Sequence, residues 1–338
     1  MKILVTGGTG YIGSHTVVEL LKSGYEVIVA DSLFNSQITV LDAIEDITGI
    51  RPMFEQIDLA NQEHTDKFFD QHKNIDAIIH FAAHKAVGES VEQPLKYYRN
   101  NLCSLMNILD NMQRHSISNL VFSSSCTVYG QPDILPVSEQ APIKKAESPY
   151  GNTKQIAEEI ISDTVSASTI KAIALRYFNP IGADASGKIG ELPVGIPNNL
   201  LPYITQTAYG VLKELKVFGN DYNTPDGTPI RDYIHVVDLA KAHVVAVSRM
   251  LEKKMKHSYE VFNLGTGKGY TVLEVIKAFE KATGIKINYC IVGRRAGDIE
   301  KVWADPTFSN NELGWKAEKG IDEMVASSWK WEQHYRNK

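Results

Sequence analysis

Cysteine is scarce in this sequence, and long apolar runs are missing. Cys103, Cys126 and Cys290 are three cysteines among 338 residues, too few and too far apart for a disulfide framework or a cysteine-based metal site. Nowhere do about 18 apolar residues follow one another, as a membrane-spanning helix requires. The formal net charge is only −5, which gives no sign of a nucleic-acid-binding surface. We therefore expect a cytoplasmic protein that uses no metal, nucleic acid or membrane.

Apolar runs alternate with helical patterns through the first half of the chain. The runs are Ile3–Val5, Val27–Ala30, Met53–Ile57, Ala77–His80, Leu120–Ser123 and Ala172–Leu175. This alternation is typical of a doubly wound parallel sheet with helices on both faces. We expect an α/β fold in which residues 1–178 form a Rossmann-type nucleotide-binding domain.

From residue 179 the pattern becomes irregular. Glycines and prolines follow one another closely, as Pro180, Gly182, Gly187, Gly190, Pro193, Gly195 and Pro197. The change predicts a different architecture. We expect residues 179–338 to form a smaller α/β substrate domain, with some later segments returning to the first sheet. Because such folds bind ligands outside the carboxyl ends of their strands, the substrate is expected between the two domains.

The turn after the first apolar run is rich in glycine. Gly7, Gly10 and Gly13 stand where a dinucleotide-binding turn needs positive φ, backbone close to a pyrophosphate and tight helix packing. Asp31 ends the second apolar run, about 20 residues past the glycines. A carboxylate there can hold both ribose hydroxyls and repels a 2′-phosphate, so the pattern favours NAD over NADP. The alternative is an ordinary glycine-rich turn followed by an aspartate that only ends a strand, and the strand–turn–helix context disfavours it.

Tyr150 and Lys154 stand four residues apart, in a segment expected to be helical after Pro149. They would share one helix face. An ammonium beside a phenol lowers the pKa of the phenol and makes it a usable general base. This spacing alone is more often a surface pair. The serine run 123–125, at the end of an apolar strand, favours chemistry, because its hydroxyls can reach the same substrate oxygen.

Longer blocks resemble the extended short-chain dehydrogenase/reductase family, and within it the UDP-sugar 4-epimerases. The blocks are Thr6–Gly13, Ser123–Ser125 with Tyr150 and Lys154, His80–Ser90, Arg176–Pro180, Gly195–Leu200 and Arg231–Val236. The resemblance extends from residue 1 to about residue 335. It implies that NAD stays bound and that UDP-galactose and UDP-glucose are interconverted through a transient 4-keto intermediate.

The same resemblance implies a role for each site residue. Catalysis would fall to Tyr150, Lys154 and Ser125, with Tyr150 taking the proton of the sugar 4-hydroxyl. Cofactor contacts would fall to Gly7, Gly10, Tyr11, Ile12, Gly13, Asp31, Ser32, Leu33, Phe34, Asn35, Ser36, Asp58, Leu59, Phe81, Ala82, Ala83, Lys85, Asn100, Ser125, Tyr150, Lys154 and Phe178. Substrate contacts would fall to Ser125, Tyr150, Asn179, Asn199, Leu200, Phe218, Arg231, Arg295, Asp298 and Val302.

Three other functions are disfavoured. Sugar-nucleotide dehydratases and decarboxylases of the same family carry acids directly after the serine strand, whereas this chain has Cys126 and Thr127, which cannot protonate a leaving hydroxide as a carboxylic acid does. A catalytically silent NAD-binding regulator would be expected to lose Tyr150 or Lys154, and this chain keeps both. Core packing explains Phe218 on its own.

Three further expectations concern specificity, assembly and one acid. Val302 is small, which would admit UDP-N-acetylglucosamine and UDP-N-acetylgalactosamine, although a core valine is the simpler reading. The resemblance implies a homodimer through the helices expected near 94–114 and 152–166, whose apolar stripes core burial explains equally well. Asp238 is expected to cap a helix, and Arg231 alone could pair with Asp232 or Asp238.

Overall fold

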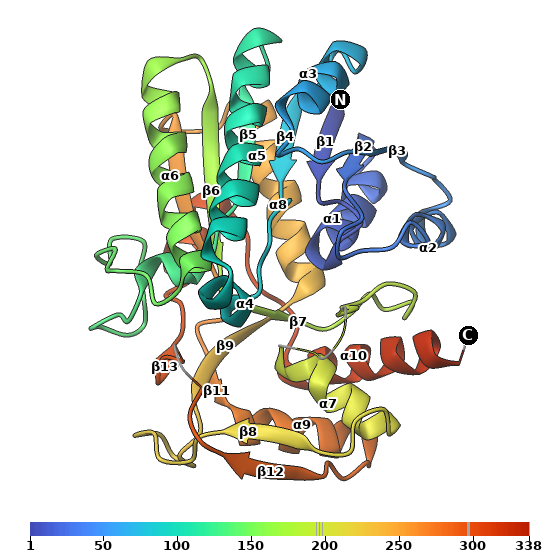
Figure 1. Ribbon diagram of the computed structural model, residues 1–338, viewed down its shortest axis with the longest axis vertical. Helices are drawn as coiled ribbons and strands as arrows, with labels where there is room; N and C mark the ends of the chain where they lie inside the picture. Colours follow the sequence, from blue (N-terminus) through green and yellow to red (C-terminus); the bar gives the residue numbers. More distant parts are fainter. Residues whose placement is uncertain (194, 196, 198, 296–297, 338) are drawn as a thin grey trace.

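The chain folds around a seven-stranded parallel sheet (Figure 1). The computed structural model describes residues 1–193, 195, 197, 199–295 and 298–337. In spatial order the strands are β10 (Tyr259–Leu264), β6 (Lys171–Tyr177), β5 (Asn119–Ser123), β4 (Ala77–His80), β1 (Lys2–Thr6), β2 (Glu26–Asp31) and β3 (Met53–Gln56). All neighbours pair in parallel, so the predicted doubly wound α/β sheet is confirmed.

Helices cover both faces of this sheet, because side chains alternate between the faces along each strand. In β1, Ile3 and Val5 belong to one apolar cluster and Leu4 to the other. The first cluster lies under α1 (Tyr11–Lys22), α2 (Val40–Thr48) and α8 (Val236–Leu251). The second lies under α3 (Gln62–Gln71), α5 (Pro94–Arg114) and α6 (Pro149–Ala167). This double burial explains why the strands read as continuous apolar runs.

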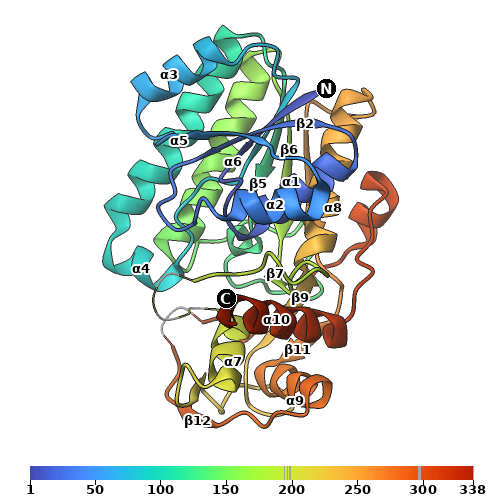
Figure 2. The same ribbon diagram turned by 90° about the vertical axis from the view of Figure 1, so that its right-hand side faces the viewer.

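A smaller α/β part lies below the large sheet in Figures 1 and 2. Its central strand, β9 (Ile230–His235), pairs with β7 (Asn179–Ile181), β11 (Gly269–Thr271) and β13 (Lys301–Val302). A separate pair joins β8 (Leu215–Phe218) to β12 (Tyr289–Val292). Three helices, α7 (Leu200–Tyr209), α9 (Val272–Thr283) and α10 (Ile321–Arg336), bury apolar side chains against these strands.

Two segments beyond residue 179 lie with the large sheet. β10 is its edge strand, and α8 packs against α1. The sheet therefore draws on both sides of the expected domain boundary near residue 178, and that boundary stays a prediction.

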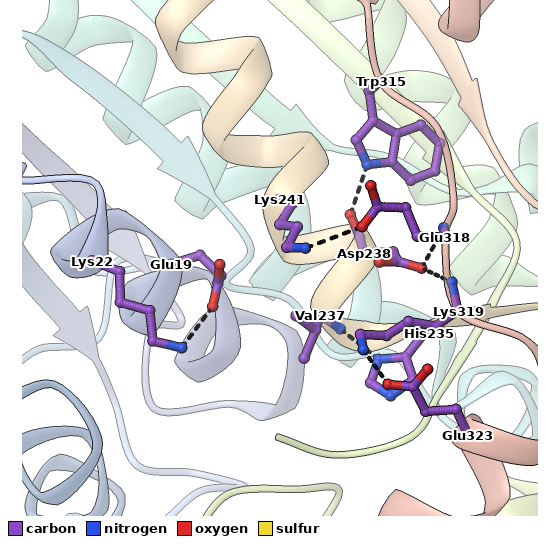
Figure 3. Close-up of polar contacts among 10 residues, drawn as sticks. All are labelled: Glu19, Lys22, His235, Val237, Asp238, Lys241, Trp315, Glu318, Lys319 and Glu323. Atoms are coloured by element: carbon purple, nitrogen blue, oxygen red, sulfur yellow. Dashed lines mark hydrogen bonds and ion pairs between the residues drawn. The ribbon is translucent and has the colours of Figure 1, made fainter. Parts of the chain in front are cut away.

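The start of α8 is tied to the segment that precedes α10 (Figure 3). Asp238 does not cap this helix. The N-cap is His235, whose Nδ1 accepts the backbone N–H of Val237 at 3.1 Å. Asp238 lies in the first turn, and its Oδ2 accepts the backbone N–H groups of Glu318 and Lys319 at 2.9 and 2.8 Å. The prediction was wrong because the partners of Asp238 come from about 80 residues away.

The remaining short elements are α4 (Val87–Glu92), η1 (Cys126–Tyr129) and η2 (Ser309–Leu313). The three cysteines are free. Within the part of the chain that the structure describes, no helix is long and apolar enough to cross a membrane. No group of three or more His, Cys, Asp or Glu side chains in those ranges is placed to hold a metal ion.

Four buried histidines are expected to make the fold sensitive to acid. Burial lowers the pKa of His15, His80, His235 and His243 below the ordinary value of 6.5. Below pH 6.5 the unfolded chain therefore binds protons that the folded chain does not bind. The free energy of unfolding should fall by about 1.4 kcal/mol per pH unit for each of them as the pH drops from 6.5 towards 4.

Urea unfolding at pH 7, 6 and 5 measures this effect. His243→Gln removes one buried histidine and should make the pH dependence shallower. His257→Gln removes an exposed histidine and serves as the control. Equal slopes in both variants and in the wild type would contradict the assignment.

Candidate active site

A pocket opens at the carboxyl ends of the parallel strands, where the strand order reverses between β1 and β4. Doubly wound sheets bind dinucleotides at this switch point. The lining residues that the sequence assigned to the cofactor are Gly7, Gly10, Tyr11, Ile12, Gly13, Asp31, Ser32, Phe34, Asn35, Asp58, Leu59, Phe81, Ala82, Ala83, Lys85, Asn100, Tyr150 and Lys154. The structure thus brings together residues that are up to about 150 positions apart in the sequence.

The glycine turn at the floor of this pocket has no room for side chains. Gly7 adopts a φ of +70°, which favours glycine. A Cβ on Gly13 would lie 2.1 Å from the Gly7 carbonyl oxygen. Helix α1 therefore packs directly onto the turn and aims its N-terminal N–H groups at the pocket. This cradle fits the pyrophosphate of a dinucleotide.

Asp31 organises the turn beside the glycines. Its Oδ2 accepts the backbone N–H of Thr9 at 3.2 Å, and its Oδ1 accepts the backbone N–H of Leu33 at 2.9 Å. Oδ1 also accepts the Ser36 hydroxyl at 3.2 Å. Asp31 lines the pocket as an acid at the end of β2, the position from which a carboxylate reaches an adenosine ribose in this fold.

The three serines 123–125, of which the first ends β5, each contact a different partner. The Ser123 hydroxyl donates to the Tyr177 phenol at 3.2 Å. The Ser124 hydroxyl donates to Oε1 of Glu158 at 2.5 Å and is fully buried. Ser125 contacts Tyr150: burial raises the pKa of that phenol, and the Ser125 hydroxyl offsets only part of the rise. Of the three serines, Ser125 is the one next to Tyr150, and it is the one to which the resemblance gives a catalytic role.

Tyr150 and Lys154 lie on the first turns of α6, whose N-cap Ser148 accepts the backbone N–H of Gly151 at 3.1 Å. Both side chains line the pocket. Lys154 Nζ donates to the Ser123 carbonyl at 2.7 Å, and burial lowers the pKa of Lys154 to about 8.

Burial raises the pKa of Tyr150 well above its ordinary value of 10. The sequence led us to expect that Lys154 would lower this pKa, but Lys154 is not among the causes of the shift: its ammonium donates to the Ser123 carbonyl, and Tyr150 is only 7% exposed. A positive charge close to the phenol would lower the pKa of Tyr150.

A second polar cluster lies in the smaller part of the chain. Arg295 Nη2 donates to Oδ1 of Asp298 at 2.8 Å, and Arg231 Nη2 lies 3.7 Å from the same oxygen. The Arg295 guanidinium stands 5.7 Å from the centre of the Phe218 ring. Arg231 pairs here with Asp298 and not with Asp232 or Asp238. Two guanidinium groups next to an aromatic ring suit a nucleoside diphosphate.

The other residues assigned to the substrate lie on β7, on β13 and at the start of α7. Asn179 belongs to β7 and Leu200 begins α7, with Asn199 as its N-cap. Val302 on β13 stands opposite Arg231 on β9. It is only 2% exposed, within an apolar cluster that includes Phe178.

Four residues assigned to the cofactor do not line the pocket itself. Leu33 and Ser36 bond Asp31, Ser125 contacts Tyr150, and Phe178 belongs to the apolar cluster that includes Val302. Sequence reasoning missed Ile57, Ala60, His84, Ser104 and Tyr177. The rule that ligands bind at the carboxyl ends of parallel strands would have found Ile57 and Tyr177, since both directly follow or end a strand.

The fold and the site together define an NAD-dependent enzyme of the doubly wound α/β class. The family described as the NAD dependent epimerase/dehydratase family matches residues 3–265. The chain belongs to this family, and within it to the UDP-glucose 4-epimerases, which are NAD-dependent isomerases.

Similar proteins support this placement over the whole chain. The chain is 52% identical to a UDP-glucose 4-epimerase of Bacillus subtilis, over 98% of this chain and 97% of that protein. It is 48% identical to a UDP-glucose 4-epimerase from Bifidobacterium longum solved with NAD+ and UDP, with a TM-score of 0.96 over 100% of this chain and 99% of that one. A UDP-glucose-4-epimerase from Stenotrophomonas maltophila, solved with bound NAD and formylated UDP-arabinopyranose, is 46% identical with a TM-score of 0.95 over 100% and 99%.

Proposed function

We propose that this chain interconverts UDP-galactose and UDP-glucose at C4 and serves galactose metabolism. The observation that carries the proposal is the Tyr150 phenol, buried in the pocket that fits NAD and in contact with Ser125. Turnover of UDP-galactose by the purified protein tests it.

In this proposal Tyr150 removes the proton of the sugar 4-hydroxyl, while Ser125 binds the same oxygen. When bound, NAD⁺ would bring a positive charge, take the hydride from C4 of the sugar, and give it back to the opposite face of that carbon. Burial raises the pKa of Tyr150, and a positive charge in the pocket would lower that pKa and favour the phenolate that acts as a base. Tyr150 then returns the proton after the 4-keto sugar has turned its other face.

The polar cluster around Asp298 would hold the UDP part of the substrate. Arg231 and Arg295 would bind the diphosphate bidentately, and Phe218 would stack on uracil. A firm hold on the nucleotide with a loose hold on the hexose allows the sugar to turn without leaving.

Elimination or decarboxylation is the runner-up chemistry. Those reactions need an acid next to the serine run, where this chain has Cys126. Burial raises the pKa of the Cys126 thiol to about 12. Such a thiol is a poor donor to a leaving hydroxide, so epimerisation is favoured.

The small side chain of Val302 supports a wider substrate range that includes the N-acetylated UDP-hexosamines. Val302→Tyr adds an aromatic ring beside Arg231. It should lower the turnover rate of UDP-N-acetylgalactosamine by at least about tenfold, and that of UDP-galactose by a smaller factor. Rates with both substrates measure the ratio.

Val302→Leu keeps an aliphatic side chain at this buried position and serves as the control. The content of bound NAD reports whether each variant folds. If the Val302→Tyr protein keeps the wild-type ratio of the two turnover rates, Val302 does not set the substrate range.

A homodimer through α5 and α6 and a cytoplasmic location also form part of the proposal. Leu105, Leu109 and Ile161 of the expected stripes are buried in the core, whereas Met106 is 42% exposed and Leu95 at the start of α5 is 63% exposed. Apolar side chains on the outer face of α5 support a partner there. Light scattering with size exclusion measures the assembly.

A further inference from the structure

Glu191 contacts both Lys85, which the resemblance assigns to the cofactor, and Asn199, which it assigns to the substrate. Its Oε1 accepts the Lys85 ammonium at 3.2 Å and the Asn199 side-chain amide at 2.6 Å. Lys85 lines the cofactor pocket, and Asn199 is the N-cap of α7 in the smaller part of the chain. One carboxylate oxygen thus lies between the two halves of the proposed site.

The surroundings hold Glu191 in place. Its side chain is only 10% exposed, and its carbonyl oxygen accepts Trp331 Nε1 of α10 at 3.2 Å. Burial, and after it the charge of Glu191, raises the pKa of Tyr11, which begins α1 and donates to the Gly182 carbonyl at 2.6 Å. Glu191 therefore connects the glycine turn of the cofactor pocket with the chain leading to α7.

No role was assigned to Glu191 from the sequence. It lies in the glycine- and proline-rich stretch after residue 179, where irregular spacing hides any periodic signal. The mechanism proposed above does not use it either.

We propose that Glu191 is a positioning residue that couples cofactor binding to nucleotide binding. The inference rests on the proposed function, because it takes Lys85 as a cofactor contact and Asn199 as a UDP contact. With the cofactor in place, an ordered Lys85 holds Glu191, and Glu191 holds the Asn199 amide in position for the nucleotide. UDP then binds more tightly, because the Asn199 side chain is already ordered and binding loses less conformational entropy. By linkage, UDP must strengthen cofactor binding by the same factor.

The experiment measures NAD release from the holoenzyme with and without saturating UDP. In the wild type, UDP should slow release by about fivefold or more. Glu191→Ala removes both contacts, and the ratio of the two rates should fall to about one. Glu191→Gln keeps an oxygen acceptor for Asn199 but loses the charge that attracts Lys85, and its ratio should be intermediate.

Glu63→Gln is the matched control. Glu63 pairs with Lys67 on the exposed surface of α3 and should keep the wild-type ratio. The double variant Lys85→Ala with Glu191→Ala should show the same ratio as Glu191→Ala alone, because the two residues act through one contact. Thermal unfolding of each variant reports any loss of stability.

Two results would overturn the inference. One is a UDP effect on NAD release that is the same in Glu191→Ala and in the wild type. The other is a wild type that turns over UDP-galactose yet shows no UDP effect at all. A wild type that does not turn over UDP-galactose would instead refute the proposed function, so the two failures are distinguishable.

Discussion

Replacing Tyr150 by phenylalanine is expected to lower kcat for UDP-galactose by about a thousandfold. The variant keeps the ring that fills the pocket wall and removes only the hydroxyl that would take the substrate proton. Because the side chain is buried and the ring is retained, the fold and the bound NAD should remain. Steady-state rates, together with the NAD content of the purified variant, measure this.

Tyr209→Phe is a suitable control for that experiment. Tyr209 ends α7, is 37% exposed and bonds Asn337 through its hydroxyl, far from the glycine turn in sequence and outside the pocket lining. Its loss should leave turnover unchanged. A Tyr150→Phe protein that retained more than about a tenth of the wild-type kcat would show that another group takes the proton.

Replacing Gly13 by alanine is expected to empty the cofactor pocket and to destabilise the fold by about 3 kcal/mol. The new Cβ would lie 2.1 Å from the Gly7 carbonyl oxygen, so either α1 or the turn must move. That carbonyl also accepts the Gly10 N–H at 3.1 Å, and a shift would break the shape of the whole turn. NAD content and the urea midpoint measure the two effects.

Gly88→Ala is the matched control for the glycine turn. Gly88 lies in α4, where nothing stands within 4 Å of a new Cβ. Alanine there should raise stability by up to about 1 kcal/mol, because it favours the helix. If the Gly13→Ala protein retains the wild-type content of NAD, the close packing of α1 on the glycine turn is not required for cofactor binding.

The central strands of the large sheet could be predicted because they are buried on both faces, unlike the edge strand β3. Ile3–Val5 and Ala77–His80 stand out as continuous apolar runs in any sequence scan. The smaller part was harder, since β7, β11 and β13 have two or three residues each and carry no periodic signal. β9 carries no continuous apolar run either, because Arg231 and Asp232 interrupt its apolar pattern.

Some site residues could likewise be predicted from short sequence spacing, and others only from the folded structure. The glycine turn and the Tyr150–Lys154 pair depend on spacing within a few residues, and spacing is visible in sequence. Tyr177 and Glu191 depend on contacts between segments that only the fold brings together. The raised pKa of Tyr150 could not be predicted either, because burial, which sets it, is a property of the tertiary structure.

The most direct test of the account is one-dimensional proton NMR of UDP-galactose mixed with the purified protein and no added NAD. The anomeric signal reports conversion to UDP-glucose. We predict conversion without added cofactor, and its loss in Tyr150→Phe. If a folded protein loaded with NAD leaves UDP-galactose unchanged, epimerisation of this substrate is refuted, and another UDP-sugar or a silent regulatory role takes its place.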